Sequence, residues 1–148
     1  MLWELVLFGC IAVVLYDASV FDIEKRLVNY FTIGLLALFV VIGFFVLNNN
    51  LVNVLFSGFF FFCVFVIPSL FSFGVGDLVV LVELGFLFNS FESGIVFMLC
   101  VAVGGIAWLL FYVRKYDVDI VPGKDFSFPF IPAIFFGFVF WVVWWVIF

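Results

Sequence analysis

The chain has 148 residues, of which 70% are hydrophobic and 10% charged, with a formal net charge of −5. Soluble globular domains have roughly 45–50% apolar and about 25% charged residues, so this composition excludes a water-covered surface and predicts lipid as the main solvent. The sequence contains no histidine, which excludes Ser-His and Cys-His nucleophilic mechanisms and most zinc sites. The length suits a single domain over residues 1–148, with any chemistry inside a helix bundle or at its rim.

Apolar runs follow one another along the chain, near residues 3–21, 31–47, 51–72, 78–91, 93–113 and 128–148. A helix that crosses a bilayer needs about 20 apolar residues, and the fourth run is the shortest in strongly apolar residues. The first run has no basic segment before it and no small-residue cleavage site, so we expect a permanent helix. The sequence therefore predicts an all-α membrane protein with about six transmembrane helices, the fourth of them short.

The basic residues predict the orientation. If all six runs cross the membrane, the five basic residues all lie on the same side of it. They are Lys25, Arg26, Arg114, Lys115 and Lys124. The positive-inside rule places that side in the cytoplasm and the N-terminus outside. We expect a multi-pass protein of the cell membrane, with cytoplasmic loops at 22–29, 73–77 and 114–127.

Two acids stand out by position. Asp22 lies at the end of the first predicted span, and Asp77 begins the fourth, directly after Gly74-Val75-Gly76. In the predicted orientation both lie at the cytoplasmic face, and ionisable residues beside membrane spans are functional by default. Two carboxyl groups that meet share one proton, so one can act as a base on water and the other as an acid on a peptide carbonyl. We predict that Asp22 and Asp77 are a catalytic pair for peptide hydrolysis, without a metal or a cofactor.

The glycines before Asp77 have two interpretations. Gly74 and Gly76 lack a Cβ, which would let an extended substrate backbone approach Asp77. Alternatively, the segment is a glycine-rich turn in which Asp77 caps a helix.

Three segments resemble the motifs of one protease family. The sequence DIEKRLVNY at 22–30 resembles the first aspartate motif of type IV prepilin peptidases and archaeal preflagellin peptidases, which are GxGD intramembrane aspartic proteases. The GVGD of 74–77, with Gly85 eight residues after Asp77, resembles their second motif. The FIPAI of 130–134 resembles the proline element that opens their last helix. These segments come in the family's order, and the resemblance covers essentially the whole chain.

The chain also departs from the family's pattern. Val28 stands where proline is common, Val79 where a lysine is frequent, and Glu83 where the family has an apolar or small residue. The bacterial members often add a cysteine-bearing loop near the N-terminus, and this sequence resembles the archaeal, peptidase-only form more closely.

The resemblance implies an endopeptidase that cleaves short basic leader peptides from type IV pilin-like or archaellin-like precursors at the cytoplasmic membrane face. It implies that Asp22 and Asp77 are catalytic, and we expect Gly74, Gly76, Pro132 and Glu24 to bind or position the substrate. The expected partners are membrane lipid and precursor peptides, with no nucleic acid. Four acids are expected on the cytoplasmic side: Glu24, Asp117, Asp119 and Asp125. They either attract a basic leader or are solvated loop residues.

Asp17 is the alternative first catalytic residue. It lies five residues before Asp22, about 140° away around a helix, so the two cannot share one face. Tyr16-Asp17, GVGD and Pro132-Ala133-Ile134 also resemble the YD, GxGD and PAL elements of presenilin-like GxGD proteases. Those proteins have more spans than this chain can hold, so we place this reading second.

A function of another class is a small proton- or cation-coupled transporter, because intramembrane acids also mark ion pathways. Asp17, Asp77 and Glu83 could form such a pathway. A transporter needs acids at mid-depth along a polar path, whereas a protease needs two facing carboxyl groups near one surface.

Two further features concern packing. Gly104-Gly105 within the fifth span either permits close approach of another helix or is incidental. Trp141, Trp144 and Trp145 fall near the outer end of the last span, where we expect them to anchor the protein at the membrane interface.

Overall fold

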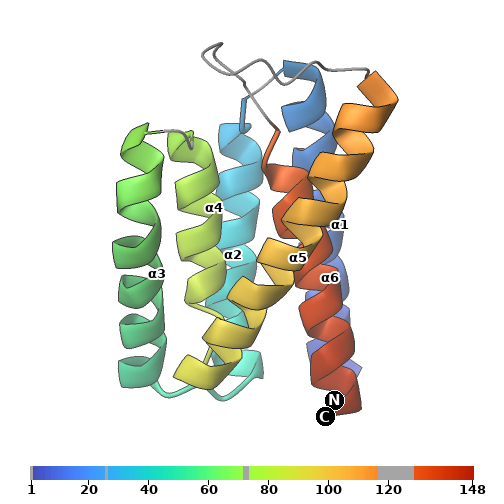
Figure 1. Ribbon diagram of the computed structural model, residues 1–148. Coiled ribbons are helices and arrows are strands. Elements are labelled where there is room, and N and C mark those ends of the chain that lie inside the picture. The colour runs from blue at the N-terminus through green and yellow to red at the C-terminus, as the bar shows by residue number, and fades with distance from the viewer. Residues whose placement is uncertain (1, 26, 72–73, 117–128) are drawn as a thin grey trace.

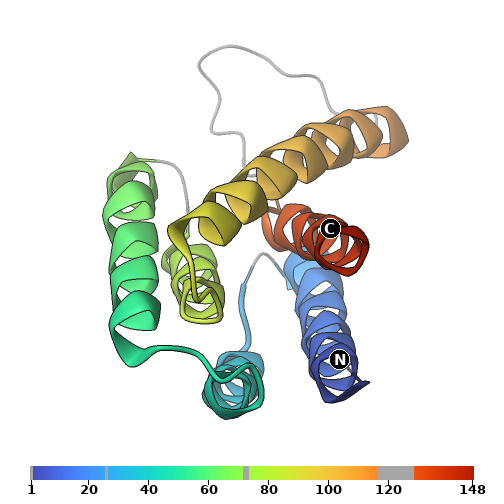
Figure 2. The ribbon, with the colours of Figure 1, turned by 90° about the horizontal axis from the view of Figure 1, so that it is seen from below.

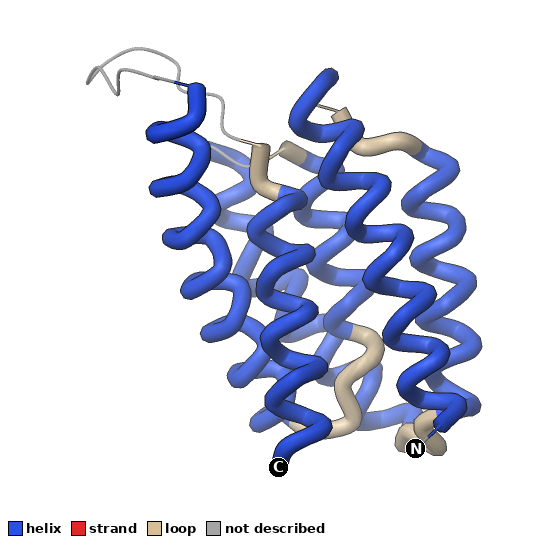
Figure 3. Tube along the Cα trace, turned by 90° about the vertical axis from the view of Figure 1, so that its right-hand side faces the viewer, coloured by secondary structure: helices blue, strands red, loops and turns tan. Residues whose placement is uncertain are grey.

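The computed structural model describes residues 2–25, 27–71, 74–116 and 129–148, and the side chains of these except 67–71 and 116. Every regular element in the described residues is a helix, which confirms the all-α prediction (Figure 3). The helices are α1 (Leu2–Lys25), α2 (Tyr30–Val46), α3 (Leu51–Phe71), α4 (Val75–Gly85), α5 (Phe91–Tyr116) and α6 (Ile131–Ile147). By length and composition, α1 and α5 are long and apolar enough to cross a membrane, whereas α2, α6 and the searched part of α3 are shorter apolar helices.

The helices run alternately up and down the bundle (Figure 1). Both chain termini lie at one end, and the C-terminal end of α1 lies at the other, together with the N-terminal ends of α4 and α6 (Figure 1). The main contacts form a closed circuit. α1 packs against α2 and α6, α4 packs against α2 and α3, and α5 packs against α3 and α6 (Figure 2).

Aromatic rings fill the centre of the bundle. Phe88 and Trp141 meet edge to face with ring centroids 4.9 Å apart, and Phe8 meets Trp141 in the same way at 5.3 Å. Trp141 is 3% exposed, and its indole N–H donates to Ser93 Oγ at 3.3 Å. The prediction that Trp141 anchors the protein at the membrane interface is therefore wrong, because this ring lies in the core and has a hydrogen-bond partner there.

Helices α5 and α6 pack closely because glycines lie at their contact. A Cβ on Gly137 would lie 2.5 Å from the Cα of Val101, and a Cβ on Gly104 would lie 3.0 Å from the backbone N of Gly137. This confirms close helix packing as the role of Gly104. A Cβ on Gly105 would meet Ala133 at an ordinary 3.6 Å, so only the first glycine of the pair is required for the contact.

Asparagines form the ends of α2. At its start, Asn29 Oδ1 accepts a hydrogen bond from the backbone N–H of Phe31 at 3.0 Å, as N-cap residues do. At its end, Asn48 has φ = 51°, a left-handed conformation that asparagine tolerates. The backbone N–H groups of Asn48 and Asn49 donate back to the carbonyls of Phe45 and Phe44. This is a Schellman motif, and it explains why the chain reverses at 48–50.

Two helix boundaries differ most from the predicted ones. α1 continues to Lys25 instead of ending at 21, so Asp22 lies in its last turn and not in a loop. α4 ends at Gly85 instead of 91. Beyond it, Asn49 Nδ2 donates to the carbonyl of Leu87 at 2.9 Å, and Asn89 Oδ1 accepts from the backbone N–H of Asn50 at 2.8 Å. The Asn49 side chain thus satisfies a carbonyl that a longer α4 would have paired internally, and the Asn89 side chain satisfies a backbone N–H just before α3.

Candidate active site

Asp22 lies at the end of α1 and is 6% exposed. Its Oδ2 accepts a hydrogen bond from the backbone N–H of Ile131 at 3.1 Å. Ile131 is the first residue of α6, where backbone N–H groups have no partner inside the helix. The carboxylate of one helix thus satisfies the start of another, 109 residues further along the chain.

Asp77 lies in the first turn of α4 and is 9% exposed. Gly74 is the N-cap and has no side chain, so Asp77 is the third helical residue. The backbone of Gly74 hydrogen-bonds the Asp77 carboxylate, and a Cβ on Gly74 would lie 3.5 Å from Asp77 Oδ2. Asp77 therefore caps α4 from inside the helix, as the acid of a capping box does, and not from the N-cap position.

The structure brings the two predicted acids together. The Asp22 carboxylate acts electrostatically on Asp77, and both belong to the few polar side chains that are buried among the described residues. Two carboxyl groups that are close enough to interact electrostatically cannot both ionise easily. This arrangement can supply one proton acceptor and one proton donor at the same place.

Of the other predicted site residues, some lie near the carboxyl pair and others do not. Pro132 is buried at the start of α6, next to the Ile131 that donates to Asp22. Its missing N–H costs nothing there, because the first turn of a helix leaves its N–H groups free. Glu24 is exposed at the end of α1, and Asp17 is exposed on the same helix, away from the pair. Asp117, Asp119 and Asp125 lie outside the described residues.

Gly76 faces a side chain of the protein itself. A Cβ on Gly76 would lie 2.6 Å from Val28 Cγ2, whereas its neighbour Gly74 would gain only an ordinary contact. Neither glycine has a left-handed φ, so neither is needed for an unusual backbone conformation. Val28 follows α1 in the chain, so the glycine allows the segment after Asp22 to lie against the first turn of α4. The space that we expected a substrate backbone to use is filled on this side by Val28.

Gly76→Ala should therefore lower the rate of any reaction at the pair about 10- to 100-fold, because pushing Val28 away shifts α4 relative to α1, and displacements of about 1 Å cost that much. The measurement is turnover with thermal unfolding in parallel, and Gly34→Ala, where a Cβ would meet nothing within 4 Å, is the control that should stay near wild type. A Gly76→Ala/Val28→Ala double variant should recover most of the rate. A single variant with normal turnover would show that the glycine only shapes the turn.

Some residues of the site carry no signal in the sequence. Ile131 contributes a backbone N–H, which any residue type except proline would supply. Trp108 on α5 is 7% exposed, and its indole N–H donates to the carbonyl of Pro129 at 3.0 Å. The only indication of Trp108 in the sequence is that a tryptophan inside an apolar span needs a partner for its N–H.

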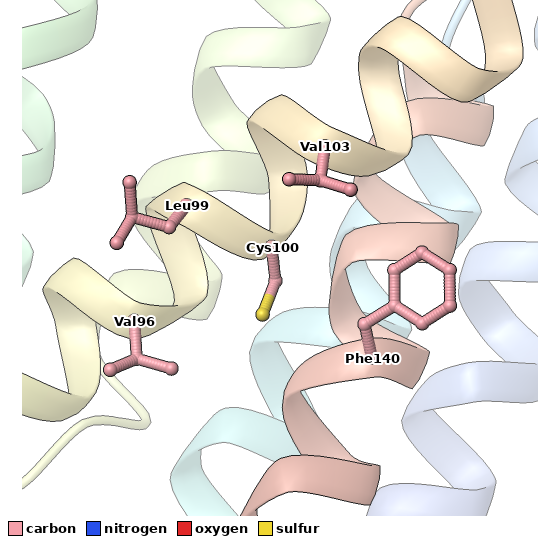
Figure 4. Close-up of a pocket in the computed structure, with 5 residues that line it drawn as sticks. All are labelled: Val96, Leu99, Cys100, Val103 and Phe140. Atoms are coloured by element: carbon pink, nitrogen blue, oxygen red, sulfur yellow. The ribbon is translucent and has the colours of Figure 1, made fainter.

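A separate apolar pocket of about 310 Å³ lies between α5 and α6, away from the carboxyl groups. Its walls are Val96, Leu99, Cys100 and Val103 of α5 and Phe140 of α6 (Figure 4). No carboxyl, amide or hydroxyl side chain lines it.

Comparisons with protein-family models, curated proteins and solved structures give no match to this chain. The two buried carboxyl groups and the family resemblance of the segments around them are therefore the features that point to a function.

Proposed function

We propose that this chain is an intramembrane aspartic endopeptidase of the type IV prepilin and preflagellin peptidase kind. It cleaves short basic leader peptides from pilin-like or archaellin-like precursors at the cytoplasmic membrane face. The observation that carries the proposal is the electrostatic interaction between Asp22 and Asp77, two buried carboxyl groups from different helices at one end of the bundle. The resemblance of their flanking segments supplies the reaction and the substrate class.

The reaction follows from a shared proton. The ionised carboxylate takes a proton from water, and the water oxygen attacks the peptide carbonyl carbon. The protonated carboxyl group donates to the carbonyl oxygen. The tetrahedral intermediate then collapses. The C–N bond breaks as the newly protonated carboxyl group donates its proton to the amine nitrogen, and a hydroxyl group of the intermediate returns its proton to the other carboxylate. General acid–base assistance of this kind contributes about 10²- to 10⁴-fold.

We propose six membrane crossings with the N-terminus outside. The alternation of the helices supports this, because it puts Lys25, Arg114 and Lys115 at the same end of the bundle. α4 has 11 residues and rises about 16 Å, against a hydrocarbon core of about 30 Å. Local thinning of the bilayer would accommodate it, and the Asn49 side chain covers a carbonyl just beyond its end.

The topology can be measured by cysteine accessibility in a variant without Cys10, Cys63 and Cys100. Single cysteines at positions 25, 75 and 115 should react with a membrane-impermeant reagent only from the cytoplasmic side. Cysteines at 49 and 91 should react only from outside. If position 115 reacted from the side opposite to 25, the fourth segment would turn back within the membrane and the proposed topology would be wrong.

The direct test of function is incubation of the purified protein with a precursor that carries a basic leader before an apolar helix. Mass spectrometry should show one cut between the leader and the helix. A precursor whose leader lysines and arginines are replaced by glutamine should be cut more slowly, since Glu24 at the end of α1 is exposed and attracts positive charge. Equal rates for the two precursors would remove the basic leader from the proposal, and no cut in either would remove the protease.

One observation favours the transporter alternative. Glu83 Oε2 is buried and has no hydrogen-bond partner within the described part of the chain. Glu83 lies six residues after Asp77 on α4, about 9 Å further along the helix, as two acids of an ion pathway could. Proton flux into liposomes that Glu83→Gln abolishes, together with no precursor cleavage by the wild type, would replace the protease proposal with this one.

A further inference from the structure

The start of α6 is held from two sides. From α5, the Trp108 indole N–H donates to the carbonyl of Pro129 at 3.0 Å. From α1, Asp22 Oδ2 accepts from the N–H of Ile131 at 3.1 Å. Only Phe130 lies between the two anchored residues, so the direction of the Ile131 N–H depends on where the Pro129 carbonyl is held.

The Trp108 ring is itself fixed. It packs against Phe111, Tyr112 and Phe136, with ring centroids 5.6, 5.9 and 6.3 Å away. Trp108, Tyr112 and Ala133 form a buried cluster, and Ile23 and Phe130 pack against it. Ile23 follows Asp22 directly in α1, so the same cluster supports the helix turn that carries the carboxylate and the peptide that binds it.

We propose that Trp108 is a positioning residue for the carboxyl pair. Its indole N–H holds the Pro129 carbonyl, this orients the Ile131 N–H, and the Ile131 N–H orients the Asp22 carboxylate toward Asp77. Trp108 contacts neither the substrate nor the reacting atoms. Its effect on cleavage rests on the proposed function, whereas its effect on the Asp22 hydrogen bond does not.

Trp141, on α6, offers a matched control. It is buried like Trp108, and its indole N–H also has one acceptor, Ser93 Oγ at 3.3 Å. Trp141 lies in the second half of α6, about 15 Å along the helix from Ile131. Trp141→Phe therefore removes the same chemical group and a similar volume without touching the hydrogen bonds of the site.

The first measurement is cleavage kinetics. Trp108→Phe should lower kcat about 10- to 100-fold with KM changed less than about threefold, because the pair is misaligned while the substrate surface is kept. Trp141→Phe should change kcat less than about threefold. Replacing Trp108 with β-(3-benzothienyl)alanine keeps the ring volume and removes only the N–H, so a comparable fall in kcat would exclude a packing effect. Wild-type kcat in this variant would overturn the proposal.

The second measurement needs no activity. In protein labelled with ¹⁵N-isoleucine, the Ile131 amide should exchange with solvent at least about tenfold faster in the benzothienyl variant than in the wild type. In Trp141→Phe it should exchange at the wild-type rate. Unchanged exchange at Ile131 in the benzothienyl variant would overturn the positioning role even if no precursor is ever cleaved. Faster exchange without any cleavage by the wild type would support it and reject the protease.

Discussion

Asp22→Asn and Asp77→Asn should each lower precursor cleavage at least about a hundredfold, since each removes one partner of an acid–base pair. Both variants should still fold. An asparagine oxygen at position 22 can accept from the Ile131 N–H, and one at position 77 can accept from the Gly74 backbone, so the helix starts keep their caps. The measurement is the initial rate of leader release by mass spectrometry, with thermal unfolding of each variant in the same detergent.

Asp17→Asn is the control for this prediction, because Asp17 lies on α1 only five residues away and is exposed. It should leave the rate within about threefold of the wild type. The Asp22→Asn/Asp77→Asn double variant should be no slower than the worse single variant, as expected of residues that act as a unit. If Asp17→Asn were inactive and Asp22→Asn fully active, the assignment of the first catalytic residue would be wrong.

Gly137→Ala should cause the largest loss of stability among alanine substitutions at the glycines that the structure describes. The new Cβ would lie 2.5 Å from the Cα of Val101 and 2.7 Å from its backbone N. Backbone atoms of a helix cannot rotate away, so α5 and α6 must separate along their contact. Overpacking costs about 1–3 kcal/mol and occasionally more, and we expect the upper part of that range. Unfolding of the purified protein by a denaturing detergent measures it.

Gly34→Ala is the matched control, because a Cβ there would meet nothing within 4 Å. It should leave stability unchanged or raise it slightly, since alanine favours a helix over glycine by about 1 kcal/mol. Equal stability of the Gly137→Ala and Gly34→Ala variants would show that α5 and α6 do not depend on close packing at this point.

The apolar runs of the sequence were sufficient to predict the helices, because lipid-compatible segments can be recognised from composition alone. Their ends were less predictable. α4 stops at Gly85, and Asn49 and Asn50 hydrogen-bond the segment that follows it. These hydrogen-bond partners lie in the turn between α2 and α3, so the pattern of the fourth apolar run alone could not predict where α4 ends.

The candidate site was likewise only partly predictable from the sequence. Asp22 and Asp77 could be predicted to meet, because an orientation rule and the alternation of spans place both at one face. The role of Ile131 could not, because its contribution is a backbone N–H and depends on how α6 is placed along α1. Val28 was noted only as a departure from proline, whereas its contact with Gly76 explains why a glycine precedes Asp77.

The N-termini of α4 and α6 stabilise negative charge on the carboxyl pair. Peptide dipoles place the equivalent of about half a positive charge at the N-terminus of a helix, and α4 and α6 both begin beside these acids. A pair that shares one proton carries one negative charge, which two such termini balance to first order without a lysine or an arginine. Such partial charges are fixed in the backbone and neither titrate nor dissociate. The charge of the pair should therefore respond little to ionic strength.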